Sequence, residues 1–246
     1  MRRIVLGAVL LGLLCAGCGR PQATLKSRKP RLFQCRRAPG KIVIDGQLEP
    51  AWERAQVLDD FRVPGFELRP LDLAMARMLW DDENLYVAVT MEDRDVYAVK
   101  TQHDGQLWLD DVAEVFLKPD EAKHIYYEFE VNAAGATLDM LIARRGAGHF
   151  DRWWPWESSI KAKVSIQGTL NEWRDSDKGW IAEIAIPLAA FKDAAPKVQL
   201  GDRWRFAICR YNYSVYLPGR EPSSTAPLTR ADFHRHEEYD FVEFAE

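Results

Sequence analysis

The sequence predicts an all-β fold: an antiparallel β-sandwich of two sheets, of the jelly-roll or immunoglobulin-like kind, with few short helices. Two observations support this prediction. Short segments of alternating apolar and polar residues recur along the 246-residue chain and are separated by turn residues. Helical periodicity is scarce, and no strand alternates with a long helix, which argues against a parallel sheet covered by helices.

The strands are expected at regular intervals along the chain. A hairpin is predicted where residues 73–80 lead through an acidic turn into residues 85–92, whose alternate apolar residues would share one face. Proline and glycine end several of the later strands. These other strands are predicted at 42–44, 113–117, 125–131, 137–143, 161–170, 180–186, 204–213 and 239–244, with short helices at 50–56 and 188–192.

The N-terminal segment predicts export. Arg2 and Arg3 precede an apolar run over residues 4–14, which has the length of a signal sequence and is too short for a membrane-spanning helix. Gly17 stands directly before Cys18 and follows a small residue, as in the lipobox of bacterial lipoproteins. We therefore expect lipidation of Cys18. Ordinary cleavage near Gly17, which would leave a soluble secreted protein, is the alternative.

These signals divide the chain into three parts. Residues 1–17 are predicted to be a lipoprotein signal peptide, and residues 18–32 a flexible tether. Residues 33–246 are expected to form the folded domain. Gly19 rather than an aspartate follows the lipidated cysteine, which favours the outer membrane, on its periplasmic or cell-surface face. The membrane would be contacted through the lipid only.

Composition and motifs exclude several classes of function. The formal net charge of −4 argues against a nucleic-acid partner, which requires a basic face. The chain has no Gly-rich phosphate loop, no G-x-S-x-G and no H-E-x-x-H motif. No metal site is predicted from His234 and His236, because a third ligand is missing. No cofactor is expected to be required, although acidic stretches at 81–83, 93–95 and 110–111 leave a structural Ca²⁺ open.

The cysteines leave two alternatives open. Once Cys18 carries a lipid, Cys35 and Cys209 are the remaining pair in the predicted domain. An oxidising compartment would permit a disulfide between them. Two buried thiols that act as small apolar side chains are the alternative.

Two predicted strands combine aromatic and acidic residues in the pattern that binds sugars. An indole ring stacks on the apolar face of a sugar, and carboxylates and amides form hydrogen bonds with its hydroxyls. The strand at 113–117 follows Trp108. In the strand at 125–131, alternation places Glu128 and Glu130 on a single face. Core aromatics with solvated acids are the alternative. The candidate ligand-binding residues are Trp108, Asp111, Glu114, Glu128, Glu130 and Asn132.

Two long loops, at 93–106 and 144–159, are also candidate binding surfaces, because loops on a β-scaffold commonly carry binding residues. The second loop contains Trp153, Trp154 and Trp156 around a proline. If exposed, these rings would form an aromatic binding patch. The alternative is that one or two of them close the end of the sandwich.

Four segments, in order, resemble the signature motifs of family 9 carbohydrate-binding modules. The resemblance covers residues 35–246 and implies an antiparallel β-sandwich with a sugar site at one edge, where two aromatic rings clamp a terminal sugar. The motifs are Ile-Asp-Gly followed by Trp at 44–52, Trp-Asp-Asp-x-x-Leu-Tyr-Val at 80–87, Trp-x-x-Asp-x-x-Glu-Val-Phe at 108–116 and Gly-Trp-x-x-Glu-x-x-Ile-Pro at 179–187.

The resemblance also implies which residues contact the sugar, and where this chain departs from the pattern. Trp108 and Glu114 correspond to ligand contacts of the family. A family arginine on the neighbouring strand is replaced by Glu130, which would repel Glu114 unless a cation such as Arg210 lies between them. The second clamping tryptophan is absent, so that Tyr216, Phe233 or a tryptophan of the 144–159 loop would have to replace it.

The sequence therefore predicts non-catalytic binding of an oligosaccharide or polysaccharide at the bacterial cell envelope, beside secreted glycan-degrading enzymes. The alternative from another class is a structural or protein-interaction β-sandwich that has lost its sugar site. A glycoside hydrolase and a haem-binding sandwich are minor alternatives. A haem-binding protein would need axial ligands to the iron. The sequence shows no diagnostic arrangement of the candidate ligands His124, His149, Met91 and Met140.

Overall fold

The structure, a computed structural model, describes residues 29–66 and 68–246. The predicted signal peptide, the lipidation site Cys18 and most of the predicted tether lie outside these residues. Within the described part of the chain, no helix is long and apolar enough to cross a membrane.

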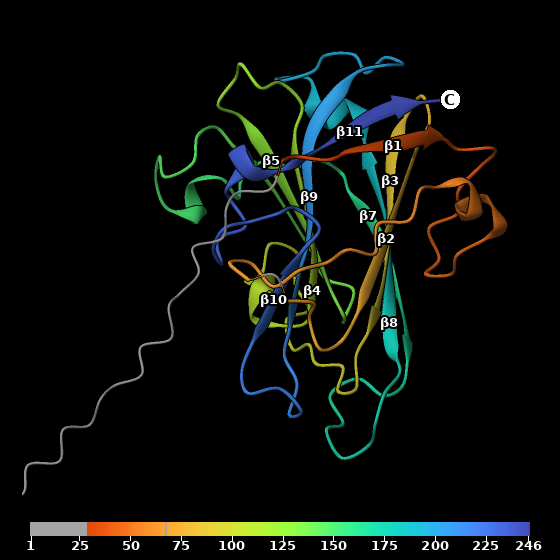
Figure 1. Ribbon diagram of the computed structural model, residues 1–246, viewed down its shortest axis with the longest axis vertical. Coiled ribbons are helices and arrows are strands. Elements are labelled where there is room, and N and C mark those ends of the chain that lie inside the picture. Colours follow the sequence, from red (N-terminus) through yellow and green to blue (C-terminus); the bar gives the residue numbers. More distant parts are fainter. Residues whose placement is uncertain (1–28, 67) are drawn as a thin grey trace, which may run out of the picture.

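The described chain is all-β, as the sequence predicts. Its eleven strands form one hydrogen-bonded sheet in the order β6-β5-β4-β9-β11-β1-β2-β3-β8-β7, with β10 beside β9. Figure 1 shows β4, β5 and β9 on one side of the molecule and β2, β3 and β8 on the other, with β1 and β11 crossing between them. The strands are β1 (Leu32–Arg37), β2 (Ala74–Trp80), β3 (Asn84–Glu92), β4 (Val112–Lys118), β5 (Tyr126–Asn132), β6 (Thr137–Ile142), β7 (Lys161–Gln167), β8 (Gly179–Pro187), β9 (Arg203–Asn212), β10 (Glu221–Ser224) and β11 (Asp240–Ala245).

The pairing of β1 corrects the prediction of a purely antiparallel sandwich. This strand runs parallel both to β11 and to β2, whereas the other ladders are antiparallel. Because the first and last strands of the described chain lie side by side, they join the two halves into one continuous hydrogen-bonded path. The sequence predicts two separate sheets, because periodicity along one strand carries no information about such long-range pairing.

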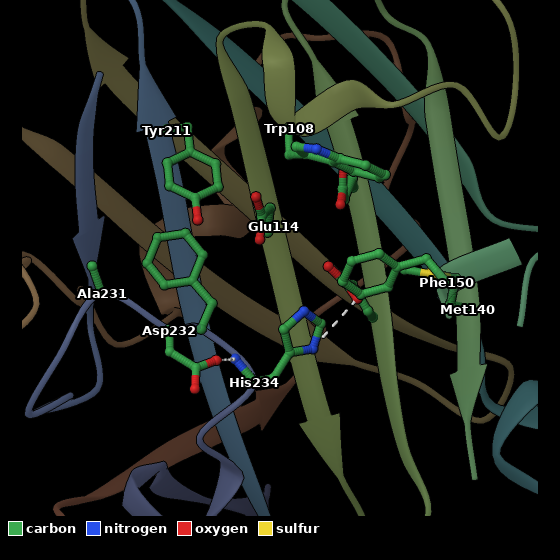
Figure 2. Close-up of a pocket in the computed structure, with 11 residues that line it drawn as sticks. Trp108, Glu114, Met140, Phe150, Tyr211, Ala231, Asp232 and His234 are labelled. Carbon is green, nitrogen blue, oxygen red and sulfur yellow. Dashed lines mark hydrogen bonds and ion pairs between the residues drawn. The ribbon is translucent and has the colours of Figure 1, made fainter. Parts of the chain in front are cut away.

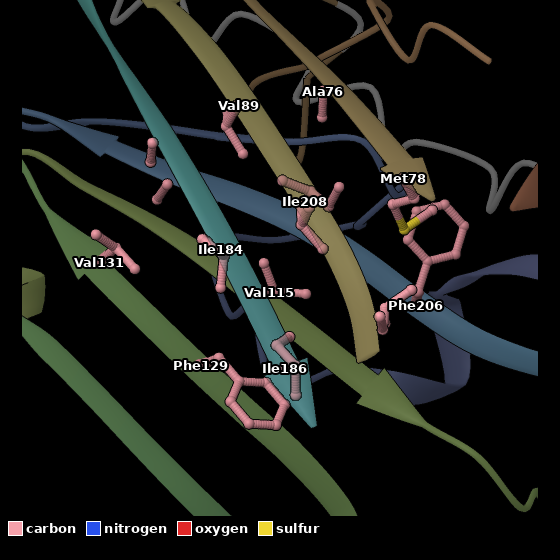
Figure 3. Close-up of a cluster of buried hydrophobic side chains, with 14 of the residues drawn as sticks. Ala76, Met78, Val89, Val115, Phe129, Val131, Ile184, Ile186, Phe206 and Ile208 are labelled. Carbon is pink, nitrogen blue, oxygen red and sulfur yellow. The ribbon is translucent and has the colours of Figure 1, made fainter. Parts of the chain in front are cut away.

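The main core lies between the two halves of the sheet (Figure 3). Alternate residues of β4 and β5, among them Val115 and Phe129, point into it from one side. Val89 of β3 and Ile184 of β8 meet them from the other side, and all four side chains are fully buried. Removal of this apolar surface from water is the main force that holds the halves together. Because their core-facing side chains anchor β4 and β5, the side chains on the other face of these two strands are held in position as well.

The predicted β2–β3 hairpin and both predicted helices are present. The Asp81 carboxylate closes the turn by accepting hydrogen bonds from the backbone N–H groups of Glu83 and Asn84, each at 2.8 Å. The helices are single turns of 3-10 type, η1 (Pro50–Arg54) and η4 (Leu188–Phe191). Three further 3-10 turns are η2 (Leu107–Leu109), η3 (Phe150–Arg152) and η5 (His236–Glu238).

Residues 42–44, which the sequence predicts as a strand, are irregular. Side chains rather than a ladder hold this segment. Ile42 belongs to a small apolar cluster with Trp52. The buried Glu183 of β8 accepts hydrogen bonds from the backbone N–H of Gly46 at 2.8 Å and from Trp52 Nε1 at 2.9 Å. This carboxylate therefore ties the N-terminal loop to β8.

The alternative of a Cys35–Cys209 disulfide is wrong. Both cysteines are buried free thiols. Cys35 packs in the main core, whereas Cys209 packs in a second apolar cluster on the other face of the sheet, where its thiol lies 3.4 Å from the Ser224 hydroxyl. A sheet separates the two sulfur atoms, so that each acts as a small apolar side chain.

Candidate functional site

A cavity of about 310 Å³ lies on the face of β4, β5, β6 and β9 that points away from the main core (Figure 2). The strands supply its floor, and η2, η3 and the loop before η5 supply its walls. Aromatic and acidic side chains dominate the lining. The residues that line it are Trp108, Glu114, Glu128, Glu130, Met140, Phe150, Tyr211, Ala231, Asp232, Phe233 and His234.

Strand register brings three glutamates together on the floor of the cavity. Glu114 of β4 lies directly opposite Glu130 of β5. Glu128 precedes Glu130 by two residues and therefore lies on the same face of β5. The three residues are 1–3% exposed, and one oxygen from each lies within 4.8 Å of the others. Within the described chain, no hydrogen-bond partner reaches Glu114 Oε1, Glu128 Oε2 or Glu130 Oε2. Three buried acceptors are therefore available to a ligand.

Burial and mutual repulsion disfavour the charged forms of these glutamates. Burial, together with the neighbouring Glu128, holds the pKa of Glu114 well above its usual range. Burial and both neighbouring carboxylates do the same to the pKa of Glu130. The pKa of Glu128 is also raised by burial, although His234 and a hydrogen bond with Glu130 oppose the shift. The cluster of three glutamates is thus electrostatically unfavourable in its fully ionised form.

Aromatic rings surround the glutamates. Tyr211 of β9 and Phe233 stack on each other with ring centroids 4.7 Å apart. Trp108 lies across the cavity from them in Figure 2, half-buried, with its ring centroid 5.7 Å from that of Phe150. The hydroxyl of Tyr213 donates to the backbone carbonyl of Trp108 at 2.8 Å and so fixes the turn that presents the indole. The cavity offers flat apolar surfaces close to hydrogen-bond acceptors.

His234 connects the cavity wall to its floor. Its Nδ1 forms a hydrogen bond of 3.0 Å with the hydroxyl of Tyr126 and lies 3.9 Å from Glu128 Oε2. The backbone N–H of His234 donates to Asp232 Oδ1 at 3.2 Å. These contacts hold the loop before η5 against β5 and keep its side chains in the wall of the cavity.

A second cavity of about 200 Å³ adjoins the first. Phe150, Asp232 and His234 line both, and Arg145 and Trp153 are among the other residues that line the second. The Arg145 guanidinium forms an ion pair with Glu237 at 2.7 Å. The shared wall means that a ligand longer than one ring could extend from the first cavity into the second.

The structure brings four predicted ligand residues together, Trp108, Glu114, Glu128 and Glu130, and places the other strand residues elsewhere. Asn132 is buried, and its side-chain amide donates to Asp110 Oδ2 and to the backbone carbonyl of Lys100, each at 2.8 Å. The Asp111 carboxylate accepts hydrogen bonds from the backbone N–H groups of Tyr97 and Tyr213, each at 2.6 Å. Asp111 and Asn132 thus tie loops together.

The prediction that Arg210 separates Glu114 from Glu130 is wrong. Arg210 lies opposite Ala113, which faces the main core, so that its side chain leaves β9 on the other face of the sheet. There its guanidinium forms a buried ion pair with Asp93 at 2.9 Å. A one-residue step along a strand reverses the direction of the side chain, and sequence alone did not fix the register of β9.

The tryptophans of the 144–159 loop do not form one exposed patch. Trp156 packs against the main core, with its ring centroid 5.4 Å from that of Tyr127. Trp153 and Trp154 are partly buried against the apolar cluster beneath the cavity, and Trp153 lines the second cavity. The alternative in which these rings close one end of the fold describes Trp154 and Trp156 better.

The sequence reasoning missed several lining residues, although a signal existed for two of them. Phe233 was one of three candidates for the second aromatic clamp, and the structure places it in the wall, whereas Tyr216 contacts Arg94 instead. Tyr211 would follow from alternation on β9 once Cys209 is known to face Glu114. Phe150 and His234 come from loops, where no periodicity identifies them.

Two clusters of the described residues have the donor spacing of a metal site. One is the set of three cavity glutamates, and the other is His103, Asp104 and Asp139 near the β5–β6 turn. Three oxygens from buried carboxylates suit a hard cation such as Ca²⁺ in chemical type, although Ca²⁺ prefers roughly six to eight oxygen ligands. The remaining walls of the cavity are mainly aromatic.

Neutralising one cavity glutamate is expected to stabilise the ligand-free fold. Because the folded-state pKa of Glu130 is raised, the stability it contributes is present at low pH and is lost as the pH rises through that folded-state value. Glu130→Gln should therefore increase the free energy of unfolding by about 1–2 kcal/mol at neutral pH and by little near pH ~4.

Urea unfolding at several pH values measures this effect. Glu172→Gln, in the β7–β8 connection, is the matched control, because Glu172 is only partly buried and forms a surface ion pair with Arg174 at 3.0 Å. This variant should change stability by less than about 0.5 kcal/mol. A loss of stability in Glu130→Gln at neutral pH would mean that the folded protein already satisfies this carboxylate.

Comparison with known proteins places this geometry in a family. The sequence profile described as "Carbohydrate family 9 binding domain-like" matches residues 44–209. Endo-1,4-beta-xylanase A of Thermotoga neapolitana is 32% identical over 89 residues, and the corresponding enzyme of Thermotoga maritima is 29% identical over 89 residues. Each match covers 36% of this chain and 8% of the enzyme, so that this chain corresponds to a small part of either xylanase.

Solved structures show the same fold. A family 9 carbohydrate-binding module from Caldicellulosiruptor kristjanssonii in complex with cellotriose superposes with a TM-score of 0.58 at 15% identity, over 87% of this chain and 94% of the module. A Bacteroides uniformis protein, provisionally described as carbohydrate-binding, gives a TM-score of 0.67 at 20% identity, over 87% of this chain and 99% of its own. Since the family profile spans well over half of the 246 residues, the protein belongs to the family 9 carbohydrate-binding domain-like family.

Proposed function

We propose that this protein binds carbohydrate without cleaving it, and that the cavity above β4 and β5 holds a sugar ring. The observation that carries this proposal is the combination in one cavity of a half-buried indole, Trp108, with three buried carboxylates, each of which has one oxygen without a hydrogen-bond partner in the described chain. The ring face of a sugar would stack on Trp108, and its hydroxyls would donate to Glu114, Glu128 and Glu130.

The arrangement of the carboxylates supports binding rather than hydrolysis. Glycosidases place two carboxyl groups on opposite sides of the scissile bond, roughly 5–9.5 Å apart. Here the three carboxyl groups gather on one floor, with oxygens within 4.8 Å of one another. The neighbours bound to cellotriose and glucose are themselves binding modules. An oligosaccharide that enters the first cavity would extend toward the second, which shares Phe150, Asp232 and His234.

The place of action we propose is the bacterial cell envelope. It rests on the N-terminal sequence, in which a signal segment ends at the lipobox-like Cys18. A lipid on Cys18 and a tether of about fifteen residues would hold the domain close to the membrane, within reach of secreted glycan-degrading enzymes. The domain would then raise the local concentration of their substrate.

Titration of the full chain against soluble oligosaccharides tests this proposal. The protein would carry Cys18→Ser so that no lipid is attached, and binding would be followed by calorimetry and by intrinsic tryptophan fluorescence. A saturable response to at least one plant, algal or bacterial glycan is expected. A flat response across the panel from correctly folded protein would contradict it and favour a protein-interaction domain.

A further inference from the structure

Acidic side chains outnumber basic ones in the lining of the cavity. Four of its lining residues are acidic, and within the described chain neither Lys nor Arg lines it. The guanidinium that partly offsets the raised pKa of Glu114 is that of Arg220, which lies over the ring of Tyr211 with its Cζ 4.1 Å from the ring centroid. Among the described residues that line the cavity, His234 is the basic side chain, and its Nδ1 lies 3.9 Å from Glu128 Oε2. A buried cluster of acids without a countercharge is costly unless a ligand supplies one.

The aromatic walls suit a positively charged ligand as well. The rings of Trp108, Phe150, Tyr211 and Phe233 line the same cavity as the glutamates. Figure 2 shows those of Trp108, Phe150 and Tyr211 around Glu114. Aromatic faces attract cations through the ring quadrupole, and most strongly when water is excluded. The same surfaces stack on sugar rings, so that one cavity can accommodate both a ring and a charge.

The glutamates stand close enough together to receive a single ammonium group. An ammonium has three N–H donors and no acceptor, and three acceptors placed about 2.8 Å from its nitrogen in tetrahedral directions lie about 4.6 Å apart. One oxygen from each of Glu114, Glu128 and Glu130 lies within 4.8 Å of the others. Ca²⁺ fits less well, because beyond these carboxylates the wall offers Asp232 as its other acid and is otherwise mainly aromatic or apolar.

We infer that the cavity takes an amino sugar, with its ring against Trp108 and its protonated amino group among Glu114, Glu128 and Glu130. This specificity rests on the proposed function, since it names the class of sugar that the same cavity binds. A neutral sugar would form hydrogen bonds with the carboxyl groups but would offer them no positive charge with which to form an ion pair. An N-acetylated sugar would also lack the charge, and it would add an acetyl group where the carboxylates meet.

Competition among three matched monosaccharides tests the inference. Glucosamine, glucose and N-acetylglucosamine would be titrated by calorimetry into the full chain carrying Cys18→Ser, at a mildly acidic pH that keeps the amine protonated. We expect glucosamine to bind at least about 10-fold more tightly than either neutral sugar. Its binding enthalpy should also depend on the buffer, because an incoming cation releases protons from the glutamates, whereas a neutral sugar leaves them in place.

Variants of the cavity separate charge from shape. Glu114→Gln and Glu130→Gln keep the volume of the side chain, and each should reduce the preference for glucosamine over glucose, measured as the ratio of the two dissociation constants, to less than about 3-fold. Glu172→Gln removes a charge from the β7–β8 connection and should leave the preference unchanged. Both cavity variants are expected to be more stable than the parent at neutral pH. A loss of the preference for glucosamine could therefore not be attributed to unfolding.

Each contrary outcome has a distinct meaning. If glucose and N-acetylglucosamine bind as tightly as glucosamine, the inference is wrong and the proposed function stands. If Ca²⁺ binds the parent protein but not Glu130→Gln, and glucosamine shows no preference, the cavity is a cation site and the inference is again wrong. If no sugar or oligosaccharide binds, the proposed function and the inference both fail.

Discussion

Glu183→Ala is expected to lower the free energy of unfolding by about 3–5 kcal/mol, the largest effect on stability that we predict. The Glu183 carboxylate is fully buried and receives the backbone N–H of Gly46 and the indole N–H of Trp52. Both donors are buried and would lose their partner, and the side chain would leave a void in a packed region. The loop over residues 42–52 would then lose its attachment to β8.

Urea unfolding, followed by tryptophan fluorescence, measures this loss. Glu183→Gln is the matched control, because its amide oxygen can still accept some of the three hydrogen bonds that Glu183 receives from Asp45 N–H, Gly46 N–H and Trp52 Nε1. It should cost about 1–2 kcal/mol. If Glu183→Ala cost less than about 1 kcal/mol, the carboxylate would not be the main tie between the N-terminal loop and the sheet.

Trp108→Ala is expected to weaken sugar binding by at least about 30-fold, equivalent to about 2 kcal/mol. The half-buried indole is the largest flat surface in the wall of the cavity, and its position is fixed by the hydrogen bond from Tyr213 to the Trp108 carbonyl. Truncation removes the stacking surface but leaves the three glutamates in place. Stability should change much less than affinity, because the ring packs at the edge of its apolar cluster.

Trp173→Ala provides the matched control for this variant. Trp173 is 55% exposed in the β7–β8 connection and lies against Arg174, outside both cavities. Its loss should leave the dissociation constant within about 2-fold of the parent value, which is less than about 0.5 kcal/mol. Equal losses of affinity in both variants would place the binding surface elsewhere.

The sequence predicted the strands far better than their arrangement. Local alternation identified β3, β5 and β8 and the β2–β3 hairpin, because each depends on neighbours along the chain. It missed β1, whose residues 32–37 alternate weakly and which is held by parallel pairing to the distant β11. It also assigned residues 42–44 to a strand, since three apolar or β-branched positions before Asp-Gly look like a strand end, whereas buried side chains fix an irregular loop there.

The four signature motifs divide into structural and functional ones once their contacts are known. The first and the fourth meet through Glu183, Gly46 and Trp52, and the second closes a hairpin through Asp81. The third alone reaches the cavity, through Trp108 and Glu114. Family membership could therefore be recognised from residues that mostly hold the fold, which explains why the fold was predicted well and the sugar specificity was not.

The candidate site was only partly predictable for the same physical reason. Alternation placed Glu128 and Glu130 on one face, and the direct pairing of Glu114 with Glu130 follows once β4 and β5 are known to be neighbours. The countercharge could not be predicted, because Arg210 and Cys209 differ by one residue and face opposite sides of the sheet. Phe150 and His234 reach the cavity from loops whose paths depend on tertiary packing.

The most direct test of the central claim, that a sugar binds above Glu114 between the aromatic walls, is nuclear magnetic resonance of the indole N–H groups. The chain has nine tryptophans, and Trp108→Phe assigns the signal of interest. During titration with the glycan that binds most tightly, the Trp108 signal should move in proportion to saturation, whereas those of the core residues Trp180 and Trp204 should stay in place. A Trp108 signal that does not move while another, such as that of Trp173, shifts on binding would contradict the account.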